Sequence, residues 1–344
     1  MSCAPRIIVH GGAGSISRAN VPRDSPAYAA YTASLREILQ RTREQLLSGA
    51  CAIDAACSAV VMFEDNPLFN CGKGSVFTRD GHNELEASLM VTSGAGKRGV
   101  GVALLRRVKN PILLAREMLR REELRHNYLS GEEAEKLAQR WGCEMVDQSW
   151  FWTERRWREH LRGLKEEEDE EGVRAEMQRN EEYLPQGTVG CVVMDRHGVL
   201  AVATSTGGLT NKLPGRIGDT PTPGAGFWAE EWELPPPPAV AMSGTGNGDY
   251  FLRVAAAHNV AARCRFGGRT LEAAVKEVVG RGGEMQRAAE NIGRWGTGEG
   301  EGGIIGMDQD GKVVWDMNCG GMFRGYVDDE GATKVAVYWD EDMC

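Results

Sequence analysis

The side chains best suited to chemistry are two threonines, an arginine and an aspartate within one short stretch of the chain. Thr188 begins and Thr206 ends a pair of apolar runs that predict a β-hairpin, so their hydroxyls are expected to lie close together. Arg216 and Asp219 follow on a glycine-rich loop at the same end. Two hydroxyls, a guanidinium and a carboxylate are therefore expected to lie together at one end of the predicted hairpin.

A threonine hydroxyl is a weak nucleophile unless a base lies beside it, and the α-amino group of an N-terminal threonine can be that base. Its ordinary pKa, about 7.7–8.0, suits a general base near neutral pH. Thr188 would gain such an amine only by cleavage of the Gly187–Thr188 bond. Gly187 has no Cβ and can present a strained peptide bond to the hydroxyl. On its own the tripeptide favours a strand that simply begins after a glycine, so the case for catalysis rests on the surrounding residues.

Those surrounding residues resemble the plant-type L-asparaginases, also called isoaspartyl peptidases, of the N-terminal-nucleophile hydrolases. The resemblance covers nearly the whole chain except 162–186 and the end after about 327. Several ordered motifs make it specific. They are Ile7–Gly14, Glu64–Asn70, Glu84–Met90, Gly187–Gly190, Thr204–Gly208, Gly215–Asp219 and Gly321–Gly325.

The resemblance implies a role for individual residues. Thr188 would be the nucleophile, assisted by Thr206. Arg216 would hold the substrate α-carboxylate and Asp219 its α-ammonium. The implied remaining site residues are Thr245 and Gly246 as the oxyanion hole, Gly248 near the substrate amine, and Asn70 near the substrate or its oxyanion.

The resemblance also implies a sodium ion held by backbone carbonyls, although no cofactor is required. A hard cation accepts carbonyl oxygens, and the alternative is a plain loop. The carbonyls would be those of Phe63, Glu64, Asn66, Phe69, Cys71 and Lys73.

Hydrophobic periodicity predicts mixed helices and strands. Strands are expected at Arg6–His10, Glu84–Val91, Gly99–Leu104, Val189–Met194, Val199–Ala203, Ala239–Met242, Gly303–Met307, Val313–Met317 and Lys334–Trp339. Helices are expected at about 26–46, Ala52–Glu64, Pro111–Arg121, Glu132–Trp141, Phe151–Leu164, Asp249–Arg265 and Leu271–Arg294, the last interrupted at Gly282-Gly283.

With the resemblance, these elements imply an α+β fold, a four-layer α-β-β-α sandwich. The chain would be one domain, 1–344, cut by self-cleavage into an α subunit, 1–187, and a β subunit, 188–344. Residues from about 165 to 186 have the composition of a disordered linker, which would leave the scissile bond accessible. The processed precursor is expected to pair as an (αβ)2 heterotetramer.

Composition argues against several classes of protein. The formal net charge of −9 over 344 residues disfavours a nucleic-acid-binding protein. Most of that charge is local, since residues 165–182 carry nine acidic and three basic side chains. No run reaches the roughly 18 apolar residues of a membrane span. The N-terminus lacks the pattern of a signal peptide, and nine cysteines without paired spacing indicate free thiols, so a cytoplasmic protein is expected.

Three other local patterns are interpreted as structural rather than functional. His10 is expected to be structural, held by backbone hydrogen bonds. The tryptophans and arginines between 150 and 158 could stack on nucleic acid, but a helix that packs its tryptophans and pairs its arginines is favoured. Four prolines at 235–238 favour a stiff loop over a partner-binding motif.

The expected function is hydrolysis of L-asparagine to L-aspartate and ammonia, removal of β-aspartyl residues from dipeptides, or both. The alternatives are an unprocessed or inactive relative that binds amino acids, and a glycosylasparaginase-like amidase. A nucleotide-binding enzyme built on the glycine-rich turns is a weaker reading, since 11–14 lacks the lysine of a phosphate loop.

Overall fold

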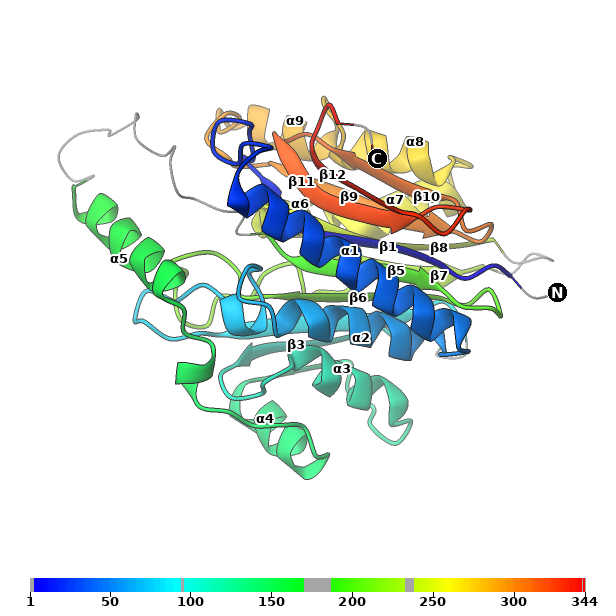
Figure 1. Ribbon diagram of the computed structural model, residues 1–344, viewed down its shortest axis with the longest axis horizontal. Helices are drawn as coiled ribbons and strands as arrows, with labels where there is room; N and C mark the ends of the chain where they lie inside the picture. Colours follow the sequence, from blue (N-terminus) through cyan, green and yellow to red (C-terminus); the bar gives the residue numbers. More distant parts are fainter. Residues whose placement is uncertain (1–2, 94–95, 170–186, 233–237, 342, 344) are drawn as a thin grey trace.

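The computed structural model describes residues 3–93, 96–169, 187–232, 238–341 and 343 (Figure 1). Its strands are β1 (Arg6–Gly14), β2 (Leu85–Val91), β3 (Val100–Leu105), β4 (Tyr128–Ser130), β5 (Val189–Met194), β6 (Leu200–Thr206), β7 (Phe227–Glu231), β8 (Ala239–Gly246), β9 (Gly302–Asp308), β10 (Val313–Met317), β11 (Gly321–Val327) and β12 (Thr333–Tyr338). Its α-helices are α1 (Pro26–Leu47), α2 (Ala52–Glu64), α3 (Pro111–Arg120), α4 (Gly131–Arg140), α5 (Glu154–Asp169), α6 (Gly248–Val254), α7 (Ala256–Arg265), α8 (Leu271–Val279) and α9 (Glu284–Glu290).

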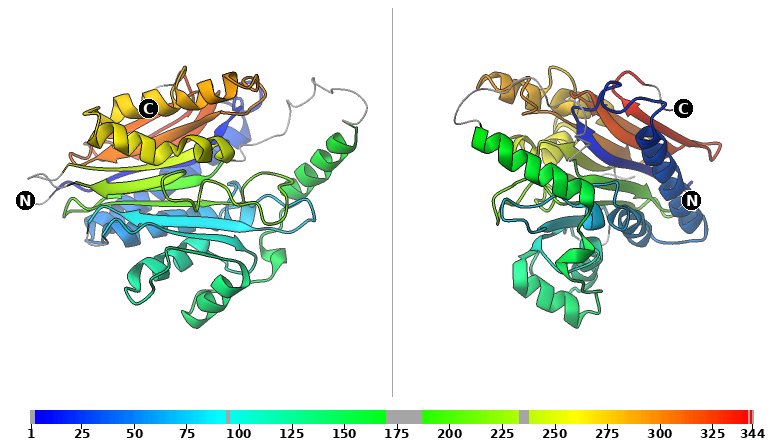
Figure 2. Two further views of the ribbon diagram at one scale, coloured as in Figure 1. Left: turned by 180° about the vertical axis from the view of Figure 1, so that it is seen from behind. Right: turned by 60° about the vertical axis from the view of Figure 1, so that its left-hand side comes forward.

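The strands form a large sheet and a small sheet that pack against each other. The large sheet has the order β12-β11-β1-β5-β6-β2-β3-β4, and the small sheet has the order β10-β9-β8-β7. Helices α1, α2 and α3 cover the outer face of the large sheet, while α7 and α8 cover the small sheet (Figures 1 and 2). The expected mixture of helices and strands is confirmed.

Alternation along the strands explains why both sheets are apolar on two faces. Successive strand residues point to opposite sides. In β1, Ile7 and Val9 belong to the core beneath the helices, while Ile8 belongs to the core between the sheets. In β5, Val193 and Val192 divide in the same way. Strands buried on both faces read as continuous apolar runs, as these do.

Several predicted boundaries differ from the structure. The helix expected over Asp249–Arg265 is two helices, because Ala255 adopts a left-handed conformation with φ of 47°. Helix α5 extends to Asp169, so the first five residues of the predicted linker are helical. The rest of that linker, 170–186, lies outside the described residues, as does most of the proline run. Strands β4, β7 and β11 were not predicted, because runs that are very short or rich in glycine or charge lack a clear period-two pattern.

Helix α5 confirms the prediction for this segment only in part, because it begins at Glu154 and leaves Trp150 and Trp152 outside the helix. The Trp157 ring lies edge-on to Phe77, with centroids 5.2 Å apart, and Arg156 forms a buried ion pair with Glu159 at 2.7 Å. No helix in the described part of the chain is long and apolar enough to cross a membrane. The cysteines of the same part are free thiols.

Candidate active site

The candidate site lies where the core between the sheets changes from apolar to hydroxyl-bearing residues. In β8, Ala241 packs between the sheets, and Ser243 and Thr245 continue the same face. In the large sheet, Val192 and Val202 occupy this core, while Thr188 and Thr206 continue their faces. One end of the inter-sheet space is therefore lined with hydroxyls, all on strands or strand ends fixed by the core.

The peptide between Gly187 and Thr188 is tightly enclosed. A Cβ added at Gly187 would lie 2.5 Å from Thr245 Oγ1 and 2.6 Å from the Ala13 backbone nitrogen. The same Ala13 nitrogen donates a hydrogen bond to Thr245 Oγ1 at 3.2 Å. Gly187 is not among the residues with positive φ. It is needed here for close approach to β1 and β8 rather than for an unusual backbone conformation.

The nucleophile candidate contacts a hydroxyl that sequence reasoning missed. Thr188 is 5% exposed, and its Oγ1 lies 2.7 Å from Thr220 Oγ1 in a buried hydrogen bond. Thr206, which was expected to lie close to Thr188, follows the register of β5 and β6 to a position opposite it, and its hydroxyl accepts a hydrogen bond from the Gly208 backbone at 3.0 Å. Thr220 directly follows Asp219 on the glycine-rich loop, and this position beside a predicted substrate-binding residue was the signal that could have found it.

His10 supports this site from β1. Its Nε2 lies 2.7 Å from Ser243 Oγ, so a side-chain hydroxyl contributes as well as the backbone. Complete burial lowers its pKa to about 3, and a backbone hydrogen bond at Thr188 opposes that shift only in part. The ring is therefore neutral at neutral pH. Gly190 is needed beside it, because an added Cβ would overlap both Ser243 and His10.

Arg216 and Asp219 meet at the N-terminus of α6. Arg216 Nη2 lies 3.2 Å from Asp249 Oδ1, and a Cβ added at Gly248 would overlap Asp219 Oδ1. Asp219 is 5% exposed, and its Oδ2 has no hydrogen-bond partner among the described residues. Burial raises its pKa to about 7, against the attraction of Arg216. A cationic amine beside Asp219 would restore the ionised carboxylate.

The remaining predicted residues surround the same end of the sheets. Thr245 is fully buried, and Gly246, with φ of 136°, lies against the Glu301 backbone. Both belong to β8 rather than to a turn. The Asn70 side chain accepts from the Val76 backbone at 3.0 Å and donates to the Gly208 backbone at 2.8 Å. Asn70 therefore fixes the loop that follows Thr206.

The loop of the predicted sodium site is compact. A Cβ added at Gly72, where φ is 47°, would overlap the Glu64 carbonyl oxygen, and one at Gly74 would overlap that of Phe69. Two carbonyls of the predicted set, those of Glu64 and Phe69, therefore pack directly against glycines of this loop. In the described part of the chain, no cluster of histidine, cysteine and carboxylate side chains offers an alternative metal site.

Comparison with known proteins bears on the whole chain. The family model described as asparaginase matches residues 3–337. An isoaspartyl peptidase of Escherichia coli is 38% identical over 96% of this chain and 95% of its own. A probable isoaspartyl peptidase/L-asparaginase of Arabidopsis thaliana is 33% identical over 96% of this chain and 98% of its own. A plant-type L-asparaginase of Pyrobaculum calidifontis is 32% identical over 93% of this chain and 96% of its own.

Proposed function

Because the chain belongs to the asparaginase family, we propose that it hydrolyses L-asparagine to L-aspartate and ammonia and removes β-aspartyl residues from dipeptides. It does so after cleaving itself between Gly187 and Thr188. The observation that carries this proposal is the enclosure of Gly187 against Thr245, next to a buried Thr188 hydroxyl. A scissile bond, a nucleophile and a hydroxyl that could stabilise an oxyanion are then neighbours.

Maturation uses residues that already surround the bond. The Thr188 hydroxyl attacks the Gly187 carbonyl carbon, the C–N bond breaks, and the nitrogen takes up the proton. The resulting ester between Gly187 and the Thr188 oxygen is hydrolysed by water. The products are a carboxylate on Gly187 and a free α-amine on Thr188, and this amine is the general base for later turnovers.

Turnover follows from the charges at the loop and helix α6. Arg216 binds the substrate α-carboxylate through paired N–H groups, and Asp219 binds the α-ammonium. Thr188 attacks the side-chain amide carbon while its amine accepts the hydroxyl proton. Thr245 and Gly246 stabilise the oxyanion. The proton passes to the leaving nitrogen, which departs as ammonia or as the amine of a peptide, and water releases aspartate.

Further features belong to the same proposal. The packed sheets and their covering helices are proposed to be the four-layer α-β-β-α sandwich of N-terminal-nucleophile hydrolases. Cleavage would give chains 1–187 and 188–344, which would assemble as an (αβ)2 heterotetramer in the cytoplasm. The carbonyls between Phe63 and Lys73 would hold a structural sodium ion that stiffens the loop beneath Asn70.

Replacement of the nucleophile tests the proposal. Thr188→Ala is expected to migrate as a single full-length chain and to release no ammonia from asparagine. Thr188→Ser keeps a hydroxyl, so it should still cleave and retain measurable activity. Ammonia release and release of amino acid from a β-aspartyl dipeptide are measured separately. A cleaved or active Thr188→Ala protein would refute the proposal.

A further inference from the structure

Two buried glutamates at one end of β2 face the loop that carries Arg216. Glu84 precedes β2 and Glu86 lies within it, so the two side chains are two positions apart and share a face. It is the face that carries Met90 into the core between the sheets. Both glutamates are buried, at 3% and 0% exposure.

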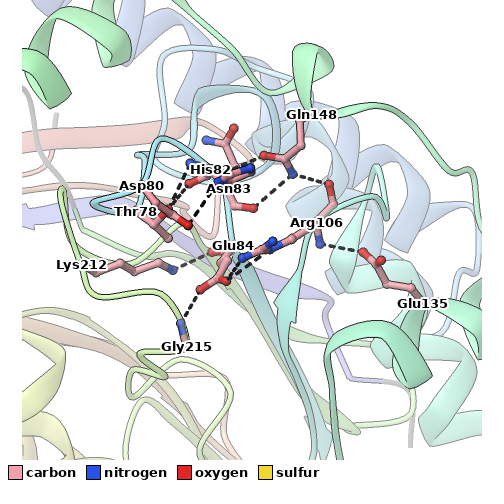
Figure 3. Close-up of polar contacts among 10 residues, drawn as sticks. All are labelled: Thr78, Asp80, His82, Asn83, Glu84, Arg106, Glu135, Gln148, Lys212 and Gly215. Atoms are coloured by element: carbon pink, nitrogen blue, oxygen red, sulfur yellow. Dashed lines mark hydrogen bonds and ion pairs between the residues drawn. The ribbon is translucent and has the colours of Figure 1, made fainter.

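Glu84 holds the loop on the N-terminal side of Arg216. Its Oε2 accepts a hydrogen bond from the Gly215 backbone nitrogen at 2.8 Å, and its main-chain oxygen accepts one from Lys212 Nζ at 2.7 Å (Figure 3). Gly215 has φ of 85°, a conformation that favours glycine. The turn immediately before Arg216 is therefore fixed by both its backbone and a side chain.

Glu86 holds the loop on the C-terminal side. Its Oε1 accepts a hydrogen bond from the Gly218 backbone nitrogen at 3.0 Å. A Cβ added at Gly218 would lie 2.8 Å from Arg216 Nη1 and 3.2 Å from Glu86 Oε2. The guanidinium is thus packed close against this turn. Arg216 lies between two backbone N–H groups that are bound by carboxylates at the same end of β2.

Arg106 pairs with the Glu84 carboxyl group and orients it. Arg106 Nη2 and Nε lie 2.7 Å and 3.3 Å from Glu84 Oε1, which leaves Oε2 for Gly215. The Arg106 backbone is itself held, since its nitrogen donates to Glu135 and its oxygen accepts from Gln148 (Figure 3). A buried carboxylate with these partners is a strong acceptor for a backbone N–H.

We propose that Glu84 is a positioning residue that sets the affinity of the site for the substrate α-carboxylate by fixing the Arg216 loop. The inference rests on the proposed function, in which Arg216 binds that carboxylate. Thr188 and Thr245 lie outside this loop, and Asp219 and Thr220 follow the Gly218 turn that Glu86 holds, so loss of the Glu84 hydrogen bond to Gly215 acts on Arg216 rather than on bond cleavage. It raises KM and leaves kcat and self-cleavage nearly unchanged.

Inhibition by product and by a product analogue tests this directly. L-Aspartate carries the α-carboxylate, while β-alanine has the same amine and distal carboxylate but lacks it. Glu84→Met, which removes the acceptor at similar size, is expected to raise the inhibition constant of aspartate about tenfold and to leave that of β-alanine unchanged. Glu84→Gln keeps an acceptor for Gly215 and should raise the constant for aspartate less than about threefold.

Two controls accompany these variants. Glu144→Met removes an exposed carboxylate that pairs with Lys109, and should match the parent enzyme. Lys212→Met removes the hydrogen bond from Lys212 Nζ to the Glu84 main-chain oxygen, which holds the same turn. It should reproduce the selective loss of aspartate affinity even if Glu84→Met does not fold. Equal losses for aspartate and β-alanine, or no loss in Glu84→Met or Lys212→Met, would overturn the inference.

Arg216→Met separates this inference from the proposed function. If Arg216→Met loses aspartate affinity selectively and Glu84→Met does not, the positioning role of Glu84 is wrong, but Arg216 still binds the α-carboxylate. If Arg216→Met leaves the inhibition constant of aspartate unchanged, Arg216 does not bind the α-carboxylate. The proposed role of Arg216 and the inference then both fail.

Discussion

Asp219 is expected to make the folded protein less stable as the pH rises, because its carboxylate is buried for binding rather than for stability. Replacement by asparagine keeps the size of the side chain and removes the charge. The sign follows from the pKa, which burial raises to about 7. The folded state then binds the proton more tightly than the unfolded chain, where an ordinary aspartate has a pKa of about 3.9. The destabilisation therefore grows between these values and is complete above pH 7.

The magnitude follows from the same pKa difference. A rise of about three units corresponds to about 4 kcal/mol at pH 8, at about 1.4 kcal/mol for each unit. At pH 5 only about 1.5 kcal/mol of that cost has developed. Loss of the attraction to Arg216 offsets part of the gain in Asp219→Asn. We therefore expect its stabilisation over the parent to increase by about 2–3 kcal/mol between pH 5 and pH 8.

The assay is the free energy of unfolding in urea at both pH values. It is made in the Thr188→Ala background, so that every variant is a single chain. Asp249→Asn is the matched control, because Asp249 also lies near Arg216 but its side chain is 49% exposed. Its effect should stay below about 1 kcal/mol at either pH. A stabilisation by Asp219→Asn that is equal at pH 5 and pH 8, or a loss of stability at pH 8, would refute the reasoning.

Three further predictions concern maturation and the cation loop. Gly187→Ala places a methyl group 2.5 Å from Thr245 Oγ1 and disturbs the scissile peptide. The variant should fold but cleave itself at least about tenfold more slowly, as followed by the loss of the full-length band on denaturing gels. An unchanged rate of cleavage would contradict the close approach. Thr220→Val removes the hydroxyl partner of Thr188 and should slow cleavage about three- to tenfold, while Thr220→Ser should cleave normally; identical rates for both variants would exclude a role for this hydrogen bond. Exchange of sodium for tetramethylammonium at constant ionic strength should lower the melting temperature if the loop over 63–73 binds sodium, whereas an unchanged melting temperature would leave it a plain loop.

The elements that the core between the sheets holds in place are mostly predictable from the sequence. The hairpin of Val189–Met194 and Val199–Ala203 is confirmed, because its apolar residues are buried on both faces and the turn carries glycine. The expected convergence of Arg216 with Asp219 follows from their place on one short loop. These features depend on local pattern, and local pattern is what a single sequence displays.

Contacts made across the fold could not be predicted in this way. Ser243 reaches His10 across 233 positions, and Glu84 reaches Gly215 across 131. No spacing rule connects such residues before the sheet order is known. The register of β5 and β6 places Thr206 opposite Thr188, as the hairpin predicts, but the Thr220 hydroxyl that bonds to Thr188 comes from a loop outside the hairpin. The hydroxyls of the site could be named from the sequence, but their pairing required the two sheets.

The most direct test of the account is the intact mass of the purified protein under denaturing conditions, with N-terminal sequencing of any fragment. The account predicts two chains, of which the second begins Thr-Val-Gly-Cys at Thr188. A chain that stays whole on long incubation, or is cut at another bond, would contradict the assignment of Thr188 as the self-released nucleophile.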